Sequence, residues 1–72
     1  MRILILVEPS ETGFSAYAPD VPGCVAAAAT REKTEALMQE ALTCHFEVLR
    51  DDGQRVPEAV SYATFVEVAV PA

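Results

Sequence analysis

The sequence predicts a single α+β domain over residues 1–72, in which one long helix packs on one face of an antiparallel sheet. Two patterns lead to this fold class. Short segments with strand character, each bounded by turn residues, occur at 3–7, 14–18, 24–29 and 62–70. Between residues 31 and 52, apolar residues recur at three- and four-residue steps, as they do in a helix. The predicted order is therefore β-β-β-α-β, and 72 residues are near the lower limit for one self-supporting core.

The first two predicted strands form a hairpin. Residues 3–7 are an unbroken run of isoleucine, leucine and valine, which is typical of a strand covered on both faces. Residues 8–13 are expected to turn, because Pro9 stops the ladder and Gly13 is free to adopt a positive φ. Residues 14–18 then return as the antiparallel second strand.

The segment from Pro19 to Cys24 is predicted to be a rigid corner. Pro22-Gly23 suits the centre of a type II turn, because proline presets φ at the first position and glycine accepts a positive φ at the second. Pro19 removes a ladder donor and so closes the strand before it. Residues 24–29 are assigned to a third strand from their context, since alanine is a poor strand former.

The long helix has a clear start and end in the sequence. Thr30 is a good N-cap, and Glu32 lies in the first turn, where the helix dipole favours an acid. Gly53, after Asp52, is the expected left-handed cap, and Pro57 lies in the loop beyond it. The apolar stripe consists of Leu37, Met38, Ala41, Leu42, His45, Phe46, Val48 and Leu49. The acidic residues that could face a basic partner, rather than being simply solvated, are Glu32, Glu35, Glu47 and Asp51.

The last predicted strand, residues 62–70, and the first one carry apolar side chains on both faces. A single helix covers only one face of a sheet, so the other face would be left as an exposed apolar patch. Burying about 500 Å² of such surface is worth roughly 12 kcal/mol before the entropic cost of association. The sequence therefore predicts association, as a homodimer or homotetramer or on another protein.

No constellation of residues in the sequence predicts catalysis or a cofactor. Cys24, Cys44, His45 and Asp20 are the only candidates, and their spacing repeats no known nucleophile motif. A zinc site needs four ligands in short paired spacings, which these residues do not supply. The glycines are scattered and form no phosphate-binding loop. The chain is predicted not to be an enzyme and to hold no metal, and Cys44 is expected to be a buried small hydrophobe.

The charge of the chain favours a basic protein as its partner. Eleven acidic residues and five basic ones give a net charge of −6, and the cations are scattered. Nucleic-acid binding usually requires clustered lysine and arginine, so direct binding of this kind is not expected. The apolar run at 3–7 is too short to cross a membrane or to act as a signal sequence. Two cysteines are most simply free thiols in a reducing cytoplasm.

Several motifs together resemble the HicB-like antitoxins of bacterial and archaeal toxin–antitoxin pairs. The resemblance spans nearly the whole chain, and two motifs at a fixed distance carry it: a PDxPGC turn and a DGxxxPE helix exit. The matching positions are Phe14 to Cys24, including Pro19, Asp20, Pro22, Gly23 and Cys24; Thr30 at the helix start; Glu40 to Leu42 and His45 to Glu47 in mid-helix; and Asp52, Gly53 and Val56 to Glu58, including Pro57, at the exit.

The resemblance implies a partial RNase H-like βββαβ domain without a catalytic set of its own. It also implies oligomerisation and the binding and occlusion of a small basic HicA-type mRNA interferase, with Asp20 as a candidate contact. Many family members continue into a DNA-binding domain, whereas this sequence stops at Ala72 and is predicted to represent the N-terminal domain alone. Two alternatives stay open: an oligomeric scaffold or regulatory subunit without a toxin, and a small RNA-processing enzyme.

Overall fold

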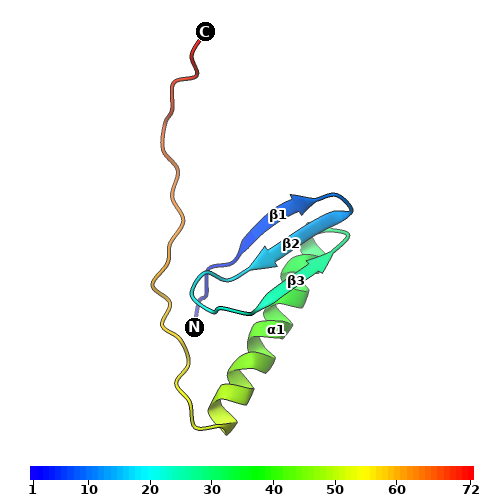
Figure 1. The fold of residues 1–72 in the computed structure, drawn as a ribbon, viewed down its shortest axis with the longest axis vertical. Helices are drawn as coiled ribbons and strands as arrows, with labels where there is room; N and C mark the ends of the chain where they lie inside the picture. Colours follow the sequence, from blue (N-terminus) through cyan, green and yellow to red (C-terminus); the bar gives the residue numbers. More distant parts are fainter.

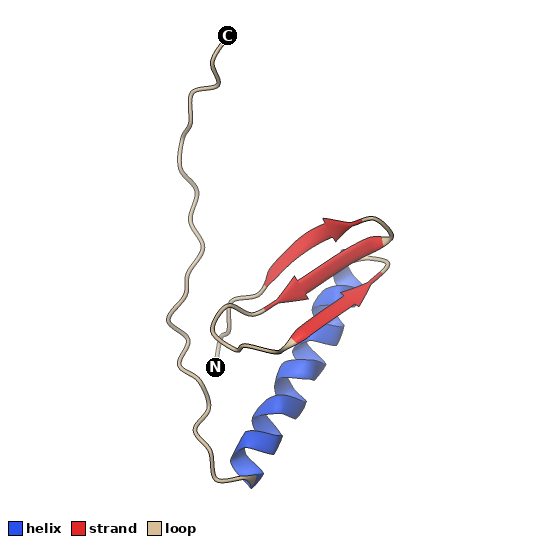
Figure 2. Ribbon diagram, viewed as in Figure 1, coloured by secondary structure: helices blue, strands red, loops and turns tan.

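The computed structural model describes all residues from Met1 to Ala72 and shows three strands followed by one long helix (Figure 1). In chain order the elements are β1 (Leu6–Ser10), β2 (Gly13–Tyr17), β3 (Val25–Ala28) and α1 (Arg31–Asp51). The helix lies across one face of the sheet, as Figure 2 shows. The α+β prediction is confirmed. The helix is not long and apolar enough to cross a membrane.

The three strands form one antiparallel sheet in the order β1-β2-β3. Tyr17 pairs with Leu6 on one side and with Val25 on the other, so these three residues form one row across the sheet. The next row contains Ala16, which is buried beneath the helix. Since side chains alternate between faces, the Leu6–Tyr17–Val25 row lies on the face away from α1. Tyr17 is 42% exposed and Val25 67% exposed, so this outer face carries exposed apolar groups.

The first hairpin differs from the sequence prediction in two respects. Pro9 does not stop the ladder but lies inside β1, opposite Phe14. A proline is tolerated there because β1 is an edge strand, whose outer side needs no donor. Gly13 does not adopt a positive φ. It is needed for space instead, because a Cβ at this position would overlap the backbone carbonyl oxygen of Ala28.

The turn between β2 and β3 has the predicted geometry. Gly23 has a φ of +86°, which a type II turn requires at its third residue. The amide of Cys24 donates a hydrogen bond to the carbonyl oxygen of Val21 over 3.3 Å. The amide of Val21 donates to the carbonyl oxygen of Ala18 over 3.1 Å. Val21 is 1% exposed. The prolines therefore bend the chain so that one apolar side chain of the corner enters the core.

Both helix ends are closed by the residues that the sequence indicated. The Thr30 hydroxyl accepts a hydrogen bond from the amide of Lys33 over 3.1 Å, which is the geometry of an N-cap. At the other end Gly53 has a φ of +72°. The amide of Gly53 donates to the carbonyl of Arg50 and that of Gln54 to the carbonyl of Leu49, which together form a Schellman motif.

The core is small and centres on one methionine of the helix. Met38 is fully buried and packs with four buried residues of β2 and the following corner: Ala16, Ala18, Val21 and Cys24. Thr34, one turn earlier in α1, is also fully buried, and its hydroxyl donates to the carbonyl of Thr30 over 2.7 Å. Ala16 in β2 and Ala18 just after it have small side chains, which leaves room for the long methionine side chain to pack against the sheet.

The predicted fourth strand is wrong for this single chain. Residues 62–70 are extended but belong to no sheet, and the chain beyond α1 runs past the body as a separate segment (Figure 1). We call residues 62–72 the arm and residues 6–53 the body. The radius of gyration is 14.9 Å, whereas a compact chain of this length has about 11 Å. A strand needs a neighbour to take up its backbone hydrogen bonds, and the arm has none here.

Two further predictions need correction. The first strand begins at Leu6 rather than at Ile3, because β2 ends at Tyr17 and leaves residues 3–5 without a partner. Cys44 is exposed rather than buried, because it lines the hollow between α1 and β3 and is not covered by the sheet. His45, in contrast, is half-buried, and its ring lies 6.3 Å from that of Phe46.

Candidate interaction surface

Asp20, at the centre of the PDVPGC corner, ties the C-terminal segment to the body. Its carboxylate accepts hydrogen bonds from the amide of Val60 at 3.0 Å, the amide of Ser61 at 2.9 Å and the hydroxyl of Ser61 at 2.6 Å. The pKa of Asp20 is lowered below 3.8, chiefly by the Ser61 hydroxyl and then by the Ser61 and Val60 amides, against the opposing effect of desolvation. Asp20 is therefore an ionised anchor within the chain.

The other residues of the corner divide between structure and surface. Pro19, Pro22 and Gly23 are exposed, while Cys24 is buried beneath them. Burial raises the pKa of the Cys24 thiol, which is the opposite of what an activated nucleophile needs. The structure thus places three corner residues where a partner could touch them, and contact with a partner stays a prediction for this turn.

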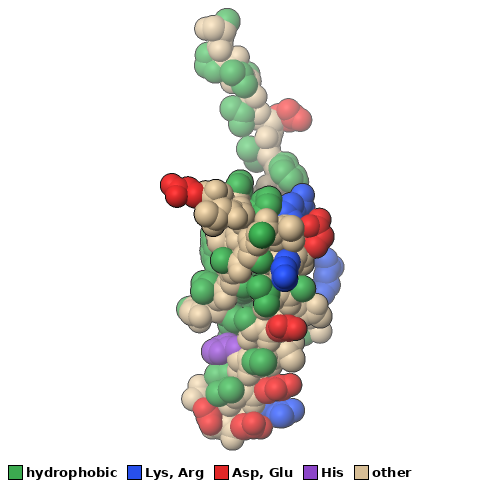
Figure 3. Space-filling model, turned by 90° about the vertical axis from the view of Figure 1, so that its right-hand side faces the viewer, with side chains coloured by type: hydrophobic (Ala, Val, Ile, Leu, Met, Phe, Trp, Pro, Cys, Tyr) green, Lys and Arg blue, Asp and Glu red, His purple; other side chains and the backbone are tan.

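The four acidic helix residues singled out in the sequence, Glu32, Glu35, Glu47 and Asp51, are all exposed. Only Asp51 forms an ion pair, with Arg50 at 3.4 Å, and both side chains are more than two-thirds exposed. Such a pair contributes little to stability. Figure 3 shows acidic side chains recurring along the lower part of the molecule, which is the helix. These carboxylates are consequently available to an external cation.

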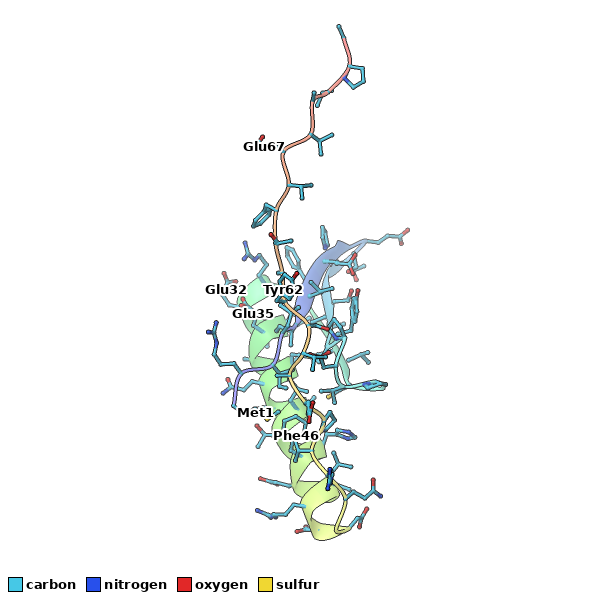
Figure 4. All side chains as sticks on the ribbon, turned by 90° about the vertical axis from the view of Figure 1, so that its left-hand side faces the viewer. Met1, Glu32, Glu35, Phe46, Tyr62 and Glu67 are labelled. Atoms are coloured by element: carbon cyan, nitrogen blue, oxygen red, sulfur yellow. The ribbon has the colours of Figure 1, made fainter.

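A groove of about 330 Å³ lies between α1 and the N-terminal residues that precede β1. Its apolar lining comes from Met1, Ile3, Ile5, Leu42 and Phe46, and its polar lining from Glu35, Gln39 and Thr43. In Figure 4, the labelled residues Met1 and Phe46 lie near one another beside the helix, with Glu35 further along it. We call this hollow the β1-edge groove. It is a mainly apolar hollow with one carboxylate, that of Glu35, in its lining.

Two other hollows flank the sheet. One, of about 520 Å³, is lined by residues 2–5 and by Ala59, Ser61, Tyr62 and Ala63, so the start of the arm lies beside the N-terminal run. The other, of about 410 Å³, lies at the β3 side between Val25 to Ala27 and the helix residues Leu37, Glu40, Ala41 and Cys44. No three metal-ligating side chains of the chain gather around an ion-sized position.

Sequence reasoning missed the partners of Asp20. Val60 and Ser61 are 40 and 41 residues away from Asp20 in the chain, and no sequence motif at these residues predicts a hydrogen bond to a carboxylate. The bonds arise because the helix exit returns the chain past the corner. Sequence reasoning also missed the β1-edge groove, since a groove depends on how residues 1–5 lie against α1.

Comparison with known proteins identifies the family. A family model described as a HicB_like antitoxin of a bacterial toxin–antitoxin system matches residues 3–69. Antitoxin HicB 2 of Photorhabdus laumondii is 33% identical over 69 residues, which cover 94% of this chain and 50% of that protein. The chain thus spans about half the length of its curated relative. No solved structure matches it significantly, so the RNase H-like outline stays a prediction. This chain belongs to the HicB-like antitoxin family of bacterial toxin–antitoxin systems.

Proposed function

We propose that this protein is a non-catalytic antitoxin that binds a small basic HicA-type mRNA interferase and occludes its RNA-binding surface. Family membership supports an antitoxin role. The observation that carries the finer proposal is the exposed acidic face of α1, where Glu32, Glu35 and Glu47 have no ion-pair partner within the chain. A basic RNA-binding surface must be positively charged, and an acidic cover competes with RNA for it.

The charge balance of the helix region agrees with this role. Residues 31–52 carry six carboxylates and three cations, so the region is acidic as a whole. Solvated charges at the rim of an interface raise the association rate and suppress wrong partners more than they raise affinity. The toxin is therefore expected to be steered to α1 by charge. Shape and apolar contacts, such as the hollow beside Leu37 and Ala41, would supply the lasting affinity.

The same proposal includes self-association and a cytoplasmic location. The outer face of the sheet exposes Tyr17 and Val25, and the arm exposes five further large apolar side chains. Such surface usually marks a contact with another protein. A second copy of this chain is the simplest candidate. A cytoplasmic location suits a protein that would act on an mRNA-cleaving toxin.

The direct test is rescue of growth. The protein is co-expressed with the product of a neighbouring gene that encodes a small basic protein toxic to the cell. The proposal predicts restored growth and a stoichiometric complex on affinity purification. If the toxic protein neither binds nor is neutralised, the antitoxin proposal fails and an oligomeric scaffold without a toxin becomes the better reading.

Charge-reversal variants locate the surface. Glu47→Lys with Asp51→Lys should weaken the complex about tenfold or more and reduce its dependence on ionic strength. The matched control is Glu8→Lys with Glu11→Lys, which makes the same charge change on exposed residues of the β1–β2 hairpin. Equal loss from both pairs, measured by titration calorimetry at two salt concentrations, would show that net charge acts and that the helix face does not.

A further inference from the structure

The arm is a strand without a sheet. Its large apolar side chains, Tyr62, Phe65, Val66, Val68 and Val70, are 73% to 99% exposed. Its alternation places Tyr62, Thr64, Val66, Val68 and Val70 on one face and Ala63, Phe65, Glu67 and Ala69 on the other. β-branched and aromatic residues in this pattern favour a half-buried strand. An exposed apolar patch of this kind marks a contact with another segment or another protein.

The outer edge of β1 is a strand edge without a partner, to which the arm could pair. This strand pairs with β2 on one side only, and residues 3–5 extend it without any partner. The run Ile3 to Val7 is apolar on both faces, which is the pattern of a central strand and not of an edge. Beside this edge lies the β1-edge groove, whose floor is formed by Ile3, Ile5, Leu42 and Phe46. A strand added here would gain ladder hydrogen bonds and cover the groove.

We propose that two copies of this chain exchange their arms, each arm pairing as a fourth strand along residues 3–7 of the other copy and burying its valines in that copy's β1-edge groove. The inference rests on the self-association proposed above and specifies how it occurs. Pro9 lacks an N–H group, so the added strand must end before it. Glu67 is the single charge of the arm and must face solvent, which turns Val66 and Val68 towards the groove.

The path of the chain favours another copy over its own edge. Asp20 holds Val60 and Ser61 beside residues 3–5, where the chain could begin to pair with its own β1. From Tyr62 onwards it runs past the sheet and away from the body (Figure 1), and no backbone hydrogen bond joins residues 62–72 to any strand. A nine-residue strand spans about 30 Å, enough to lie along a neighbouring sheet.

The chemistry of the arm favours a second copy over a basic toxin. Eleven residues carry one charge, so the arm offers little to a cationic surface. A second copy provides both a groove and an arm, and a twofold axis then satisfies two arms and two edges at once. The β3 edge is a poorer acceptor, because β3 has only four residues, three of them alanine. Each arm would bury on the order of 500 Å² of side chain, so arms and grooves together approach the 1,200–2,000 Å² of a stable interface.

Disulfide trapping in the full chain tests the exchange. In a Cys44→Ser background, Glu67→Cys is combined in turn with Leu4→Cys, Leu6→Cys or Glu8→Cys, three alternate positions of residues 3–8 on the face away from α1 that cover the alternative registers. Mild oxidation should link at least one pair into a covalent dimer on a denaturing gel. A covalent monomer would show that each arm folds onto its own β1. A covalent dimer no more abundant than in the Glu67→Cys with Glu47→Cys control would also overturn the exchange.

Sedimentation separates this inference from the proposal on which it rests. The natural chain should sediment as a dimer at micromolar concentration, and a monomer would overturn both. Val66→Arg with Val68→Arg should raise the dimer Kd about 100-fold or more while circular dichroism shows the helix intact. The control is Val48→Arg, which adds a charge at an exposed valine of α1 outside the groove and the arm. A dimer that withstands the arm substitutions, or one that Val48→Arg weakens equally, would overturn the arm exchange and leave self-association standing.

Discussion

The body and the arm both contain many apolar residues, but these residues are buried in the body and exposed in the arm. In the body, Met38 and Val21 are fully buried by contacts between the helix, β2 and the corner. In the arm, Phe65 is 99% exposed although its neighbours alternate as regularly as those of any strand in the chain. The difference shows that apolar patterning specifies a strand only when a partner edge is within reach. Local sequence supplies the tendency, and pairing supplies the structure.

The two regions also differ in how their ends are held. The body has a capped helix, a type II turn and a Schellman motif, each made by residues close in sequence. The arm has no hydrogen bond to the body, and the chain is held only just before it, where the Asp20 carboxylate accepts hydrogen bonds from Val60 and Ser61. We therefore expect substitutions in the body to change the free energy of unfolding and substitutions in the arm to change association. The following predictions are ordered from the largest expected effect to the smallest.

Met38→Ala should have the largest effect on the body. Removing a fully buried methionine side chain leaves a cavity, and such changes cost about 2–5 kcal/mol. In a domain of this size that loss approaches the whole stability. Urea unfolding followed by circular dichroism measures it, with the exposed neighbour Gln39→Ala as control. A loss below about 1 kcal/mol would show that the core of the body is not centred on Met38.

Gly13→Ala should destabilise the body by about 1–3 kcal/mol, because the added Cβ would overlap the Ala28 carbonyl and push β3 away. Gly53→Ala is the matched control. Its site is sterically open, but its φ of +72° is unfavourable for alanine, which costs about 1 kcal/mol. Thermal unfolding of both variants compares the two causes. If Gly13→Ala is tolerated, close approach of β3 is not required there.

Thr30→Ala should cost about 1 kcal/mol, because the amide of Lys33 loses its cap. Thr43→Ala is the control, since its hydroxyl also bonds within the helix, to the Gln39 carbonyl, but at an exposed mid-helix position. We expect that control to change stability by less than about 0.5 kcal/mol. Equal effects in chemical denaturation would mean that the helix start is set by packing and not by the cap.

Asp20→Asn should free the start of the arm with little change in the unfolding of the body. The lowered pKa of Asp20 means that its anchoring is complete above its ordinary value of 3.8 and is lost as the pH falls through the lower folded value. Amide hydrogen exchange at Val60 and Ser61 should therefore be faster in the variant at pH 7. The natural chain should approach the variant only at acidic pH. Unchanged exchange would exclude the anchor.

Val70→Ser should have the smallest effect on a single chain. Its side chain contacts almost nothing within its own copy, so at the lowest concentrations the unfolding temperature should stay unchanged. At higher concentration the natural chain should gain stability from association and the variant should gain less. Melting temperatures measured over a hundredfold concentration range test this. A drop in the variant at every concentration would mean that the arm packs on its own body.

The sequence was most informative where structure is local. The Thr30 cap, the Gly53 exit and the Pro22-Gly23 turn all lie where they were predicted, because each depends on a few adjacent residues. The predictions were wrong where the structure of a residue depends on segments distant in the sequence. The first strand lies three residues further along, since its register depends on where β2 ends. Cys44 is exposed because the hollow between α1 and β3 leaves its side chain uncovered.

The candidate surface was predictable in its charge and not in its shape. The exposed acidic residues of α1 follow from helical spacing, which places Glu47 and Asp51 away from Met38. The bonds of Asp20 to residues 40 and 41 positions later, and the β1-edge groove, required the chain to be folded first. No local rule joins a corner to a segment beyond the helix.

By itself, the sequence determined the α+β class, both helix ends, the corner and the acidic character, since propensity, capping and charge act over a few residues. Tertiary structure alone decided that residues 62–70 have no strand partner within their own chain and that Asp20 accepts hydrogen bonds from Ser61. It also decided that β1 keeps a free edge. The physical reason is that the backbone hydrogen bonds of a strand are made with a neighbouring strand. Whether an extended segment joins a sheet therefore depends on whether the fold brings a free strand edge within hydrogen-bond distance.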